Sequence, residues 1–423
     1  MQIAILAPTA DVWSEAGLSA KAFHQTPWYA HELWQTLSQH GCSADYVSQK
    51  ALQRAKCQHG KLCCGPMEYD ALVIVDAQSL APATTSALVL FADGGGRLVF
   101  VGRKPERAAG LNNIEQRDQA VAQAMQHLAD SKDAKVFEIA APLKPEELFG
   151  WTNELINKLA IPRSVAFDKP SRDLHQVHYR HGDRDIFFLA NTSGEHAVAT
   201  DARFDAQGSH AWRWDPETGQ LAVYSTADKQ ARIRLDPHES LLLVFEPTEP
   251  PANAPRVPAP VEEWQETLAI SGPWAAECTP VAGKPFSVSE LPLGDLRKSG
   301  DERLQRFAGD IVYRTRFELS EIPAGQIAIC LGAMHDIAEV QLNGEPLGTV
   351  WYGAPRFDAT RRLQVGANAL EVRVATPLYN YTQSLEDNAT AMYWKNRTSN
   401  QELVPAGLIG PVRLVIPNTT EDR

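Results

Sequence analysis

The spacing of apolar residues along the chain changes near residue 165, and this change limits the fold more than any other feature. Before it, short apolar runs such as residues 3–7 alternate with amphipathic segments, as between Thr26, a predicted N-cap, and Gly41. Beyond it, apolar and polar residues alternate in short runs that turn sequences such as 181–184 separate. The first pattern predicts strands joined by crossover helices, and hence a parallel sheet, whereas the second predicts antiparallel β-structure.

A proline-rich segment divides the β-rich part in two. Residues 247–260 contain six prolines, which favour extended polyproline II and lack a donor N–H, so we expect a linker that joins no sheet. The predicted fold class is multidomain, an α/β part followed by all-β parts. The predicted domains are a parallel-sheet α/β domain at 1–163, a small antiparallel β-domain at 164–247, the linker at 248–261 and a β-sandwich at 262–418.

Charge and composition exclude several classes of partner. The chain has 423 residues and a formal net charge of −12, which disfavours nucleic acid and anionic membrane surfaces as partners. No apolar run reaches the roughly 18 to 20 residues that cross a bilayer, and the N-terminus has no signal-peptide pattern. The expected location is cytoplasmic if Met1 is the true start, and periplasmic or secreted if the chain is part of a longer exported protein. The six cysteines include no C-x-x-C pair and are expected to be ordinary thiols.

No motif assigns a catalytic residue to this chain. The glycines at 94–96 follow a predicted helix and precede a strand, the reverse of the order in a phosphate-binding loop. His31 and Glu32 begin a zinc-protease pattern that fails because position 35 is Gln35. Carboxylate pairs suit glycoside hydrolysis, but only about the first 160 residues alternate between strand and helix, too few for a (β/α)₈ barrel. We therefore expect no catalytic residue here, and the sequence assigns no metal ligand.

Aromatic and amide side chains gather around predicted loops of the last domain. Aromatic rings stack on sugar rings and amides bond sugar hydroxyls, so these residues are candidates for carbohydrate binding. Packing in the core or against another domain would use the same residue types. The candidates are Asn343, Trp351, Tyr352, Tyr379, Asn380 and Trp394.

Several motifs resemble a known family of enzymes. Residues 338–348, 357–360 and 370–374 are similar to the jelly-roll sugar-binding domain of family-2 glycosidases. Residues 407–412, Gly-Leu-Ile-Gly-Pro-Val, resemble an element that ends such a domain in family-106 glycoside hydrolases, the α-L-rhamnosidases. Upstream, 185–191 and 214–219 resemble that family's intermediate β-domain, and 9–13, 31–33 and 91–95 resemble its flavodoxin-like domain, which is related to the glutamine-amidotransferase fold.

The resemblance implies three folds: a flavodoxin-like or amidotransferase-like α/β domain, a small β-sandwich and a C-terminal galactose-binding-like jelly roll. In that family a catalytic barrel with an acidic pair and a calcium site precedes these domains. The implied role is therefore an accessory, carbohydrate-binding or scaffold region without the barrel and inactive alone. Its implied partners are a glycan that contains rhamnose and a catalytic barrel domain or subunit, with no cofactor of its own. The alternative is a stand-alone, non-catalytic carbohydrate-binding or assembly protein.

Overall fold

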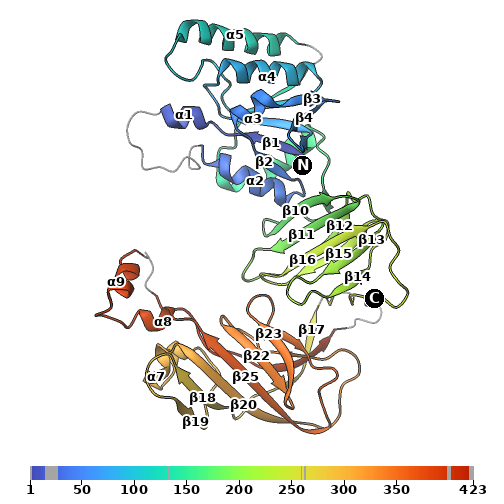
Figure 1. Ribbon diagram of the computed structural model, residues 1–423. Coiled ribbons are helices and arrows are strands. Elements are labelled where there is room, and N and C mark those ends of the chain that lie inside the picture. Colours follow the sequence, from blue (N-terminus) through green and yellow to red (C-terminus); the bar gives the residue numbers. More distant parts are fainter. Residues whose placement is uncertain are drawn as a thin grey trace. The chain divides into compact units, whose positions relative to one another are not determined.

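The structure, a computed structural model, describes residues 2–14, 27–131, 134–258, 260–261, 263–397 and 402–418. The chain forms two compact units, one of residues 1–235 with 240–259 and the other of 236–239 with 260–423 (Figure 1). The predicted N-cap Thr26 lies outside the described residues. Across the described ranges, no helix has both the length and the apolar character that a membrane span requires.

A five-stranded parallel sheet forms the centre of the α/β domain, with the strand order β2-β1-β6-β7-β8. The predicted parallel sheet is therefore confirmed. Side chains of its central strands are buried on both faces, which explains the continuous apolar runs in the sequence. The strands are β1 (Ile3–Leu6), β2 (Ala44–Tyr46), β6 (Ala71–Val75), β7 (Arg97–Val101) and β8 (Lys135–Ile139).

Helices cover both faces of this sheet. One apolar cluster joins one face to α2 (Tyr29–Gln39) and α6 (Leu148–Lys158). A second cluster joins the other face to α3 (Gln49–Arg54), α4 (Pro82–Asp93) and α5 (Ile114–Asp130). The remaining helical segments are α1 (Thr9–Ser14) and η2 (Pro145–Glu147).

Gly41 closes α2, as the sequence predicts. Its φ is +80°, and a Cβ at this position would lie 1.7 Å from the carbonyl oxygen of Val165. Only glycine fits here, because any side chain would meet both an unfavourable φ and the backbone of the following domain.

A small three-stranded antiparallel sheet in the α/β domain is absent from the sequence prediction. It consists of β3 (Lys56–Gln58), β4 (Lys61–Cys64) and β5 (Met67–Tyr69). Only Leu62 and Tyr69 of these strands are buried, so the apolar pattern is too short to reveal them.

The small β-domain packs two antiparallel sheets around one apolar core, which confirms the predicted antiparallel β-structure. One sheet has the order β10-β11-β16-β13-β14 and the other β15-β12-β9. The strands are β9 (Val165–Phe167), β10 (Leu174–His181), β11 (Arg184–Asn191), β12 (Val198–Phe204), β13 (His210–Trp214), β14 (Leu221–Tyr224), β15 (Gln230–Leu235) and β16 (Ser240–Glu246).

The prediction that the proline-rich linker joins no sheet is wrong at residues 255–257. The N–H of Val223 in β14 donates to the carbonyl oxygen of Pro255 at 2.7 Å, and the N–H of Val257 donates to the carbonyl oxygen of Val223 at 2.9 Å. Arg256 thereby forms a parallel bridge with Val223. A proline lacks only its N–H, so its carbonyl still accepts a hydrogen bond from a neighbouring strand.

The C-terminal sandwich consists of a four-stranded sheet, β17-β26-β21-β24, and a six-stranded sheet, β19-β18-β20-β25-β22-β23. The strands are β17 (Trp264–Ala269), β18 (Ala275–Pro280), β19 (Phe286–Val288), β20 (Gly309–Leu319), β21 (Ala328–Cys330), β22 (Ile337–Leu342), β23 (Glu345–Val350), β24 (Arg356–Asp358), β25 (Gly366–Thr376) and β26 (Arg413–Pro417). The helical segments are η3 (Leu296–Lys298), α7 (Glu302–Gln305), α8 (Tyr379–Thr382) and α9 (Ala389–Lys395).

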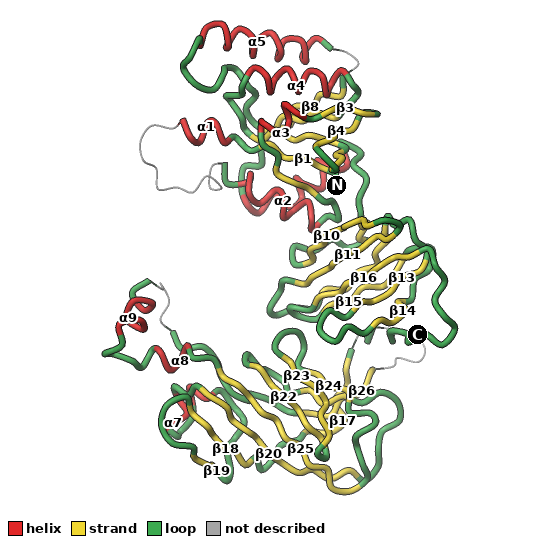
Figure 2. The backbone as a smooth tube through the Cα atoms, in the orientation of Figure 1, coloured by secondary structure: helices red, strands yellow, loops and turns green. Residues whose placement is uncertain are grey.

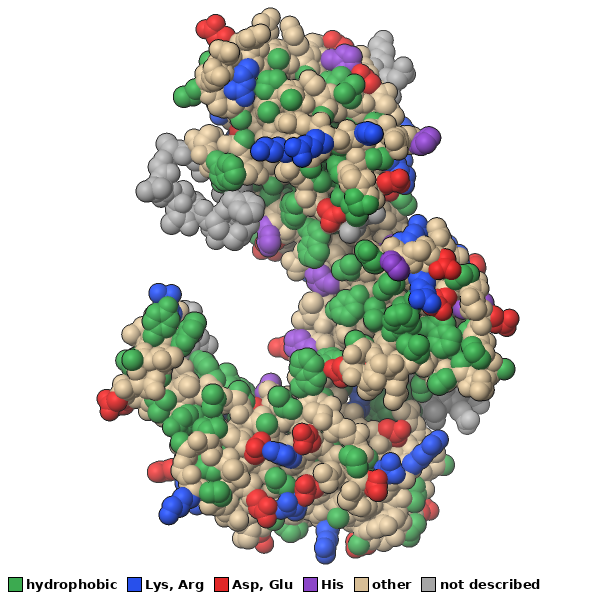
Figure 3. Space-filling model, in the orientation of Figure 1, with side chains coloured by type: hydrophobic (Ala, Val, Ile, Leu, Met, Phe, Trp, Pro, Cys, Tyr) green, Lys and Arg blue, Asp and Glu red, His purple; other side chains and the backbone are tan. Residues whose placement is uncertain are grey.

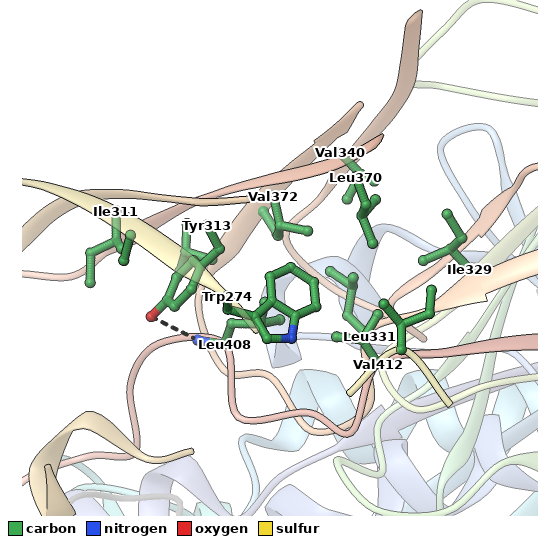
Figure 4. Packing of buried hydrophobic residues seen from close by; sticks show 14 of the residues in the cluster. Trp274, Ile311, Tyr313, Ile329, Leu331, Val340, Leu370, Val372, Leu408 and Val412 are labelled. Atoms are coloured by element: carbon green, nitrogen blue, oxygen red, sulfur yellow. Dashed lines mark hydrogen bonds between the residues drawn. The ribbon is translucent and has the colours of Figure 1, made fainter. Parts of the chain in front are cut away.

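Both sheets of the sandwich contribute to one apolar core. Trp274 lies at its centre beside Leu331, Leu408 and Val412 (Figure 4). The backbone N–H of Leu408 donates to the Tyr313 hydroxyl at 3.4 Å, so the segment after α9 is joined to β20. Leu408 and Val412, which follow α9 in the chain, thus form part of the core.

Candidate functional site

Five of the six predicted site residues belong to segments that leave the six-stranded sheet at one end. The start of β22 pairs with the end of β23, as Ala338 opposite Val350 shows. The end of β25 pairs with the starts of β22 and β20, since Ala375 lies opposite Ile337 and Thr376 opposite Gly309. The chain therefore leaves β23 and β25 at the same end. The residues concerned are Trp351, Tyr352, Tyr379, Asn380 and Trp394, and we call the aromatic members the aromatic rim.

Asn343 lies at the opposite end of that sheet. It occupies the turn between β22 and β23 with φ +56°. Its side chain joins this turn to residues 362–369 by hydrogen bonds. Its amide nitrogen donates to the Arg362 carbonyl at 2.9 Å and to Asn368 Oδ1 at 3.0 Å, while its Oδ1 accepts from the Ala369 N–H at 2.9 Å. These contacts give Asn343 a structural task away from the other five residues.

Trp351, which is exposed, and Tyr352, which is half-buried, form an aromatic pair directly after β23. Their ring centroids are 4.7 Å apart and the rings are nearly perpendicular, at 79°. The Trp351 side chain is 63% exposed. Such a pair presents a ring face and a ring edge to a ligand or to another protein surface.

The segment of α8 and α9 carries the other rim residues and projects beyond the strands of its own domain (Figure 2). Asn380 is buried and anchors the segment, because its amide donates to the Val404 carbonyl at 2.8 Å and its Oδ1 accepts from the Val404 N–H at 2.9 Å. On α9, Tyr393 and Trp394 form a second perpendicular pair at 5.4 Å, and Trp394 is 60% exposed. Apolar side chains gather on this projection (Figure 3).

A cavity of about 320 Å³ lies at the same end of the sheet, towards its β19 edge. Three cationic side chains line it, Lys284, Arg303 and Arg306, together with aromatic residues that include Phe286 and Tyr381. The sequence prediction missed this cavity, because its cations come from two short segments that are about 20 positions apart and carry no shared motif.

Asp336 is a buried carboxylate immediately before β22, at this same end of the sheet. Burial raises its pKa to about 6; the hydrogen bond from the Gly407 N–H opposes this rise and the charge of Asp295 adds to it. The sequence contained Asp336 as one unmarked carboxylate among many. Its burial, which sets it apart, depends on contacts with residues more than 70 positions away.

The small β-domain contains a Ser-His-Asp arrangement that the sequence did not indicate. His178 Nδ1 lies 3.2 Å from Ser164 Oγ, and its Nε2 lies 2.8 Å from Asp185 Oδ1. A nucleophilic serine must reach its substrate, but Ser164 is fully buried and also accepts from Gln2 Nε2 at 2.9 Å. His178 is further stacked on Phe187, with centroids 4.3 Å apart. The arrangement therefore stabilises the core and presents no accessible nucleophile.

The described residues include neither a cluster of metal ligands nor a buried thiol with a lowered pKa. Among them, no group of three or more His, Cys, Asp or Glu side chains is arranged to hold a metal ion. All six cysteines are free, and burial raises the pKa of the Cys42 thiol to about 12 and that of Cys278 to about 11. Such thiols are poor nucleophiles at neutral pH.

The chain is similar to glycoside hydrolases. Residues 24–226 match the family model of α-L-rhamnosidases, glycoside hydrolase family 106. This chain is thus related to the family-106 glycoside hydrolases, as the sequence motifs predicted.

Two known proteins are similar to this chain over different parts of it. A rhamnosidase from Novosphingobium sp. PP1Y has a similar solved structure, with a TM-score of 0.64 and 21% identity, covering 98% of this chain and 39% of that one. A putative β-glucuronidase from Formosa agariphila is 29% identical over 188 residues, which is 36% of this chain and 16% of that protein. The chain therefore spans well under half the length of either protein.

Proposed function

We propose that this chain is an accessory region of an α-L-rhamnosidase-like glycoside hydrolase, and that its aromatic rim docks against a catalytic (β/α)₈ barrel. The observation that carries the proposal is the exposure of Trp351 and Trp394 at one end of the C-terminal sandwich. An exposed group of large aromatic side chains commonly marks a surface that another domain covers.

The fold supports specific domain assignments within this proposal. The strand order of the parallel sheet is the one found in flavodoxin-like folds, so we assign the α/β domain to that class. We assign the C-terminal sandwich, with its four-stranded and six-stranded sheets, to galactose-binding-like jelly rolls. The likeness in fold to the Novosphingobium rhamnosidase over nearly the whole chain supports both assignments.

Hydrolysis in this proposal depends on carboxylates that the barrel supplies. Cleavage of a glycoside needs one carboxyl group to protonate the leaving oxygen and another to attack or to activate water on the other side of the bond. The purified chain should therefore leave an aryl α-L-rhamnoside intact. If turnover were abolished by changing one carboxylate of this chain, the accessory role would be wrong.

A second candidate function is carbohydrate binding without any hydrolase. The perpendicular Trp351 and Tyr352 rings favour it, because such a pair can stack on the C–H face of a sugar. Single shallow sugar sites of this kind bind with Kd values of about 1 mM, or roughly 4 kcal/mol.

Sedimentation and calorimetry on the whole chain separate the two functions. Docking predicts that the wild-type chain associates with itself or with an added barrel, and that Trp351→Ala and Trp394→Ala weaken this association. Trp13→Ala is the matched control, since Trp13 is 81% exposed and belongs to the α/β domain. Saturable heat with a rhamnose-containing oligosaccharide, lost in Trp351→Ala, would instead favour sugar binding. Equal association of all three variants would overturn the docking role.

A further inference from the structure

The cavity at the β19 edge of the six-stranded sheet has a charge opposite to that of the protein. Lys284, Arg303 and Arg306 line it, and none of its described lining residues is Asp or Glu. The chain as a whole carries a net charge of −12. A concave site of one sign concentrates ligands of the other sign, so this cavity favours an anion.

The three cations play different parts. Arg303 already has partners within the protein: its guanidinium forms an ion pair with Asp301 and lies 4.0 Å from the centroid of the Phe286 ring. Neither Lys284 nor Arg306 forms an ion pair with any residue in the described ranges. Arg303 therefore forms a fixed wall, while Lys284 and Arg306 retain their charge for a ligand.

The shape of the cavity is fixed by buried residues beneath it. Phe307 and Ala308 line it and are almost wholly buried, and the backbone N–H of Val281 donates to the Ala308 carbonyl at 2.8 Å. Its volume of about 320 Å³ lies at the lower end of the range of about 300 to 1,000 Å³ for small-ligand sites. A solvated patch of surface cations would have no such floor.

The remaining wall suits a sugar ring. Tyr381 follows β25 and contributes a half-buried aromatic ring with a hydroxyl group to the cavity. Aromatic rings stack on the apolar face of a pyranose, and a phenol bonds its hydroxyls.

We propose that this cavity binds an acidic sugar residue, a pyranose that carries a carboxylate or a sulfate group. The choice of a sugar rests on the proposed role in glycan hydrolysis, whereas the choice of an anion rests on the lining charges alone. Four strand spacings separate β18 from β23, or about 19 Å, so the cavity and Trp351 are too far apart to share one sugar ring.

Titration calorimetry on the full chain at low salt tests the proposal with four probes: glucuronic acid, glucose 6-sulfate, glucose and L-rhamnose. At least one anionic probe should bind with a Kd in the millimolar range, at least tenfold more tightly than either neutral sugar. Binding of only one anion identifies which group the cavity takes. Lys284→Gln and Arg306→Gln should each weaken anion binding at least fivefold, and added salt should weaken it in the wild type.

Arg361→Gln is the matched control, because Arg361 is an exposed arginine of the same domain next to Arg362, whose carbonyl bonds Asn343 at the other end of the sheet. Thermal melting of each variant checks that it is folded. Equal binding of neutral and anionic sugars, no anion binding up to 50 mM, or equal weakening by Arg361→Gln would overturn the proposal. Each of these outcomes is independent of the Trp351 association assay, so the docking role can stand or fall separately.

Discussion

The Asp336 carboxylate accepts a hydrogen bond from the backbone N–H of Gly407, with Oδ2 2.6 Å from the nitrogen. Its other oxygen, Oδ1, is buried and accepts no hydrogen bond from the described residues. Gly407 has a φ of +87°, and a Cβ there would lie 2.5 Å from Leu296 Cγ. The contact therefore fixes the Gly-Leu-Ile-Gly-Pro-Val segment to the start of β22 through a carboxylate that is costly to ionise.

Asp336→Asn should change how the stability of the C-terminal sandwich depends on pH. The pKa of Asp336 is about 6 in the folded protein and near 4 when unfolded, so the folded state binds the proton more tightly. The stabilisation from the protonated form is present below the unfolded pKa and is lost as pH rises through 6. The wild type should thus lose about 2 to 3 kcal/mol relative to Asp336→Asn between pH 4 and pH 8.

Denaturant unfolding of both proteins at several pH values measures this difference. Asp387→Asn, which changes an exposed carboxylate of the same domain, is the control and should follow the wild type. A constant gap between wild type and Asp336→Asn across this pH range would show that Asp336 does not titrate as its burial implies.

The small β-domain should lose stability as the pH falls, whereas Asp336 makes the C-terminal sandwich lose stability as the pH rises. Asp185 is fully buried, and although burial raises its pKa, hydrogen bonds from the Gln207 N–H, Arg180 and His178 outweigh this and lower it overall. A lowered carboxylate pKa gives stability that is present above the unfolded value near 4 and is lost as pH falls through the folded value. His178, whose pKa burial lowers, also destabilises the fold when it is protonated in acid.

Asp185→Ala should cost about 2 to 4 kcal/mol at pH 7, because it leaves His178 Nε2 and the Gln207 N–H without their acceptor. Hydrogen exchange at β10 and β11 locates the loss in this domain. Asp201→Ala is the comparison, since Asp201 pairs with Arg232 on the surface and should cost at most about 1 kcal/mol. Equal effects of the two substitutions would refute a special role for the buried network.

Asn343→Ala should destabilise the C-terminal sandwich by about 2 to 3 kcal/mol, since alanine disfavours a positive φ and removes three hydrogen bonds. Asn343→Gly keeps the backbone conformation and loses only the side-chain contacts, so it should cost less. Neither variant should alter sugar binding or association. If a variant melted like the wild type but bound sugar more weakly, the structural role of Asn343 would be wrong and a role in carbohydrate binding would be favoured.

The sequence pattern was sufficient to predict those elements whose burial or turn geometry depends on neighbouring residues alone. The buried strands β1, β6 and β7 follow from continuous apolar runs, and the Asn343-Gly344 turn follows from its dipeptide. Gly41 ends α2 because the helix needs a left-handed residue there. The strands β3 to β5 escaped detection because each has three or four residues and little buried surface.

The sequence by itself determined the change from a parallel sheet with helices to antiparallel β-structure and the relation to family-106 glycoside hydrolases, since these depend on residues close together in the chain. The tertiary structure alone separated Asn343 from Trp351, buried Asp336 and Asp185, and brought Lys284, Arg306 and Tyr381 around one cavity. Strand register and burial decide these features. Both arise from contacts between residues distant in the chain, which no local spacing of residue types encodes.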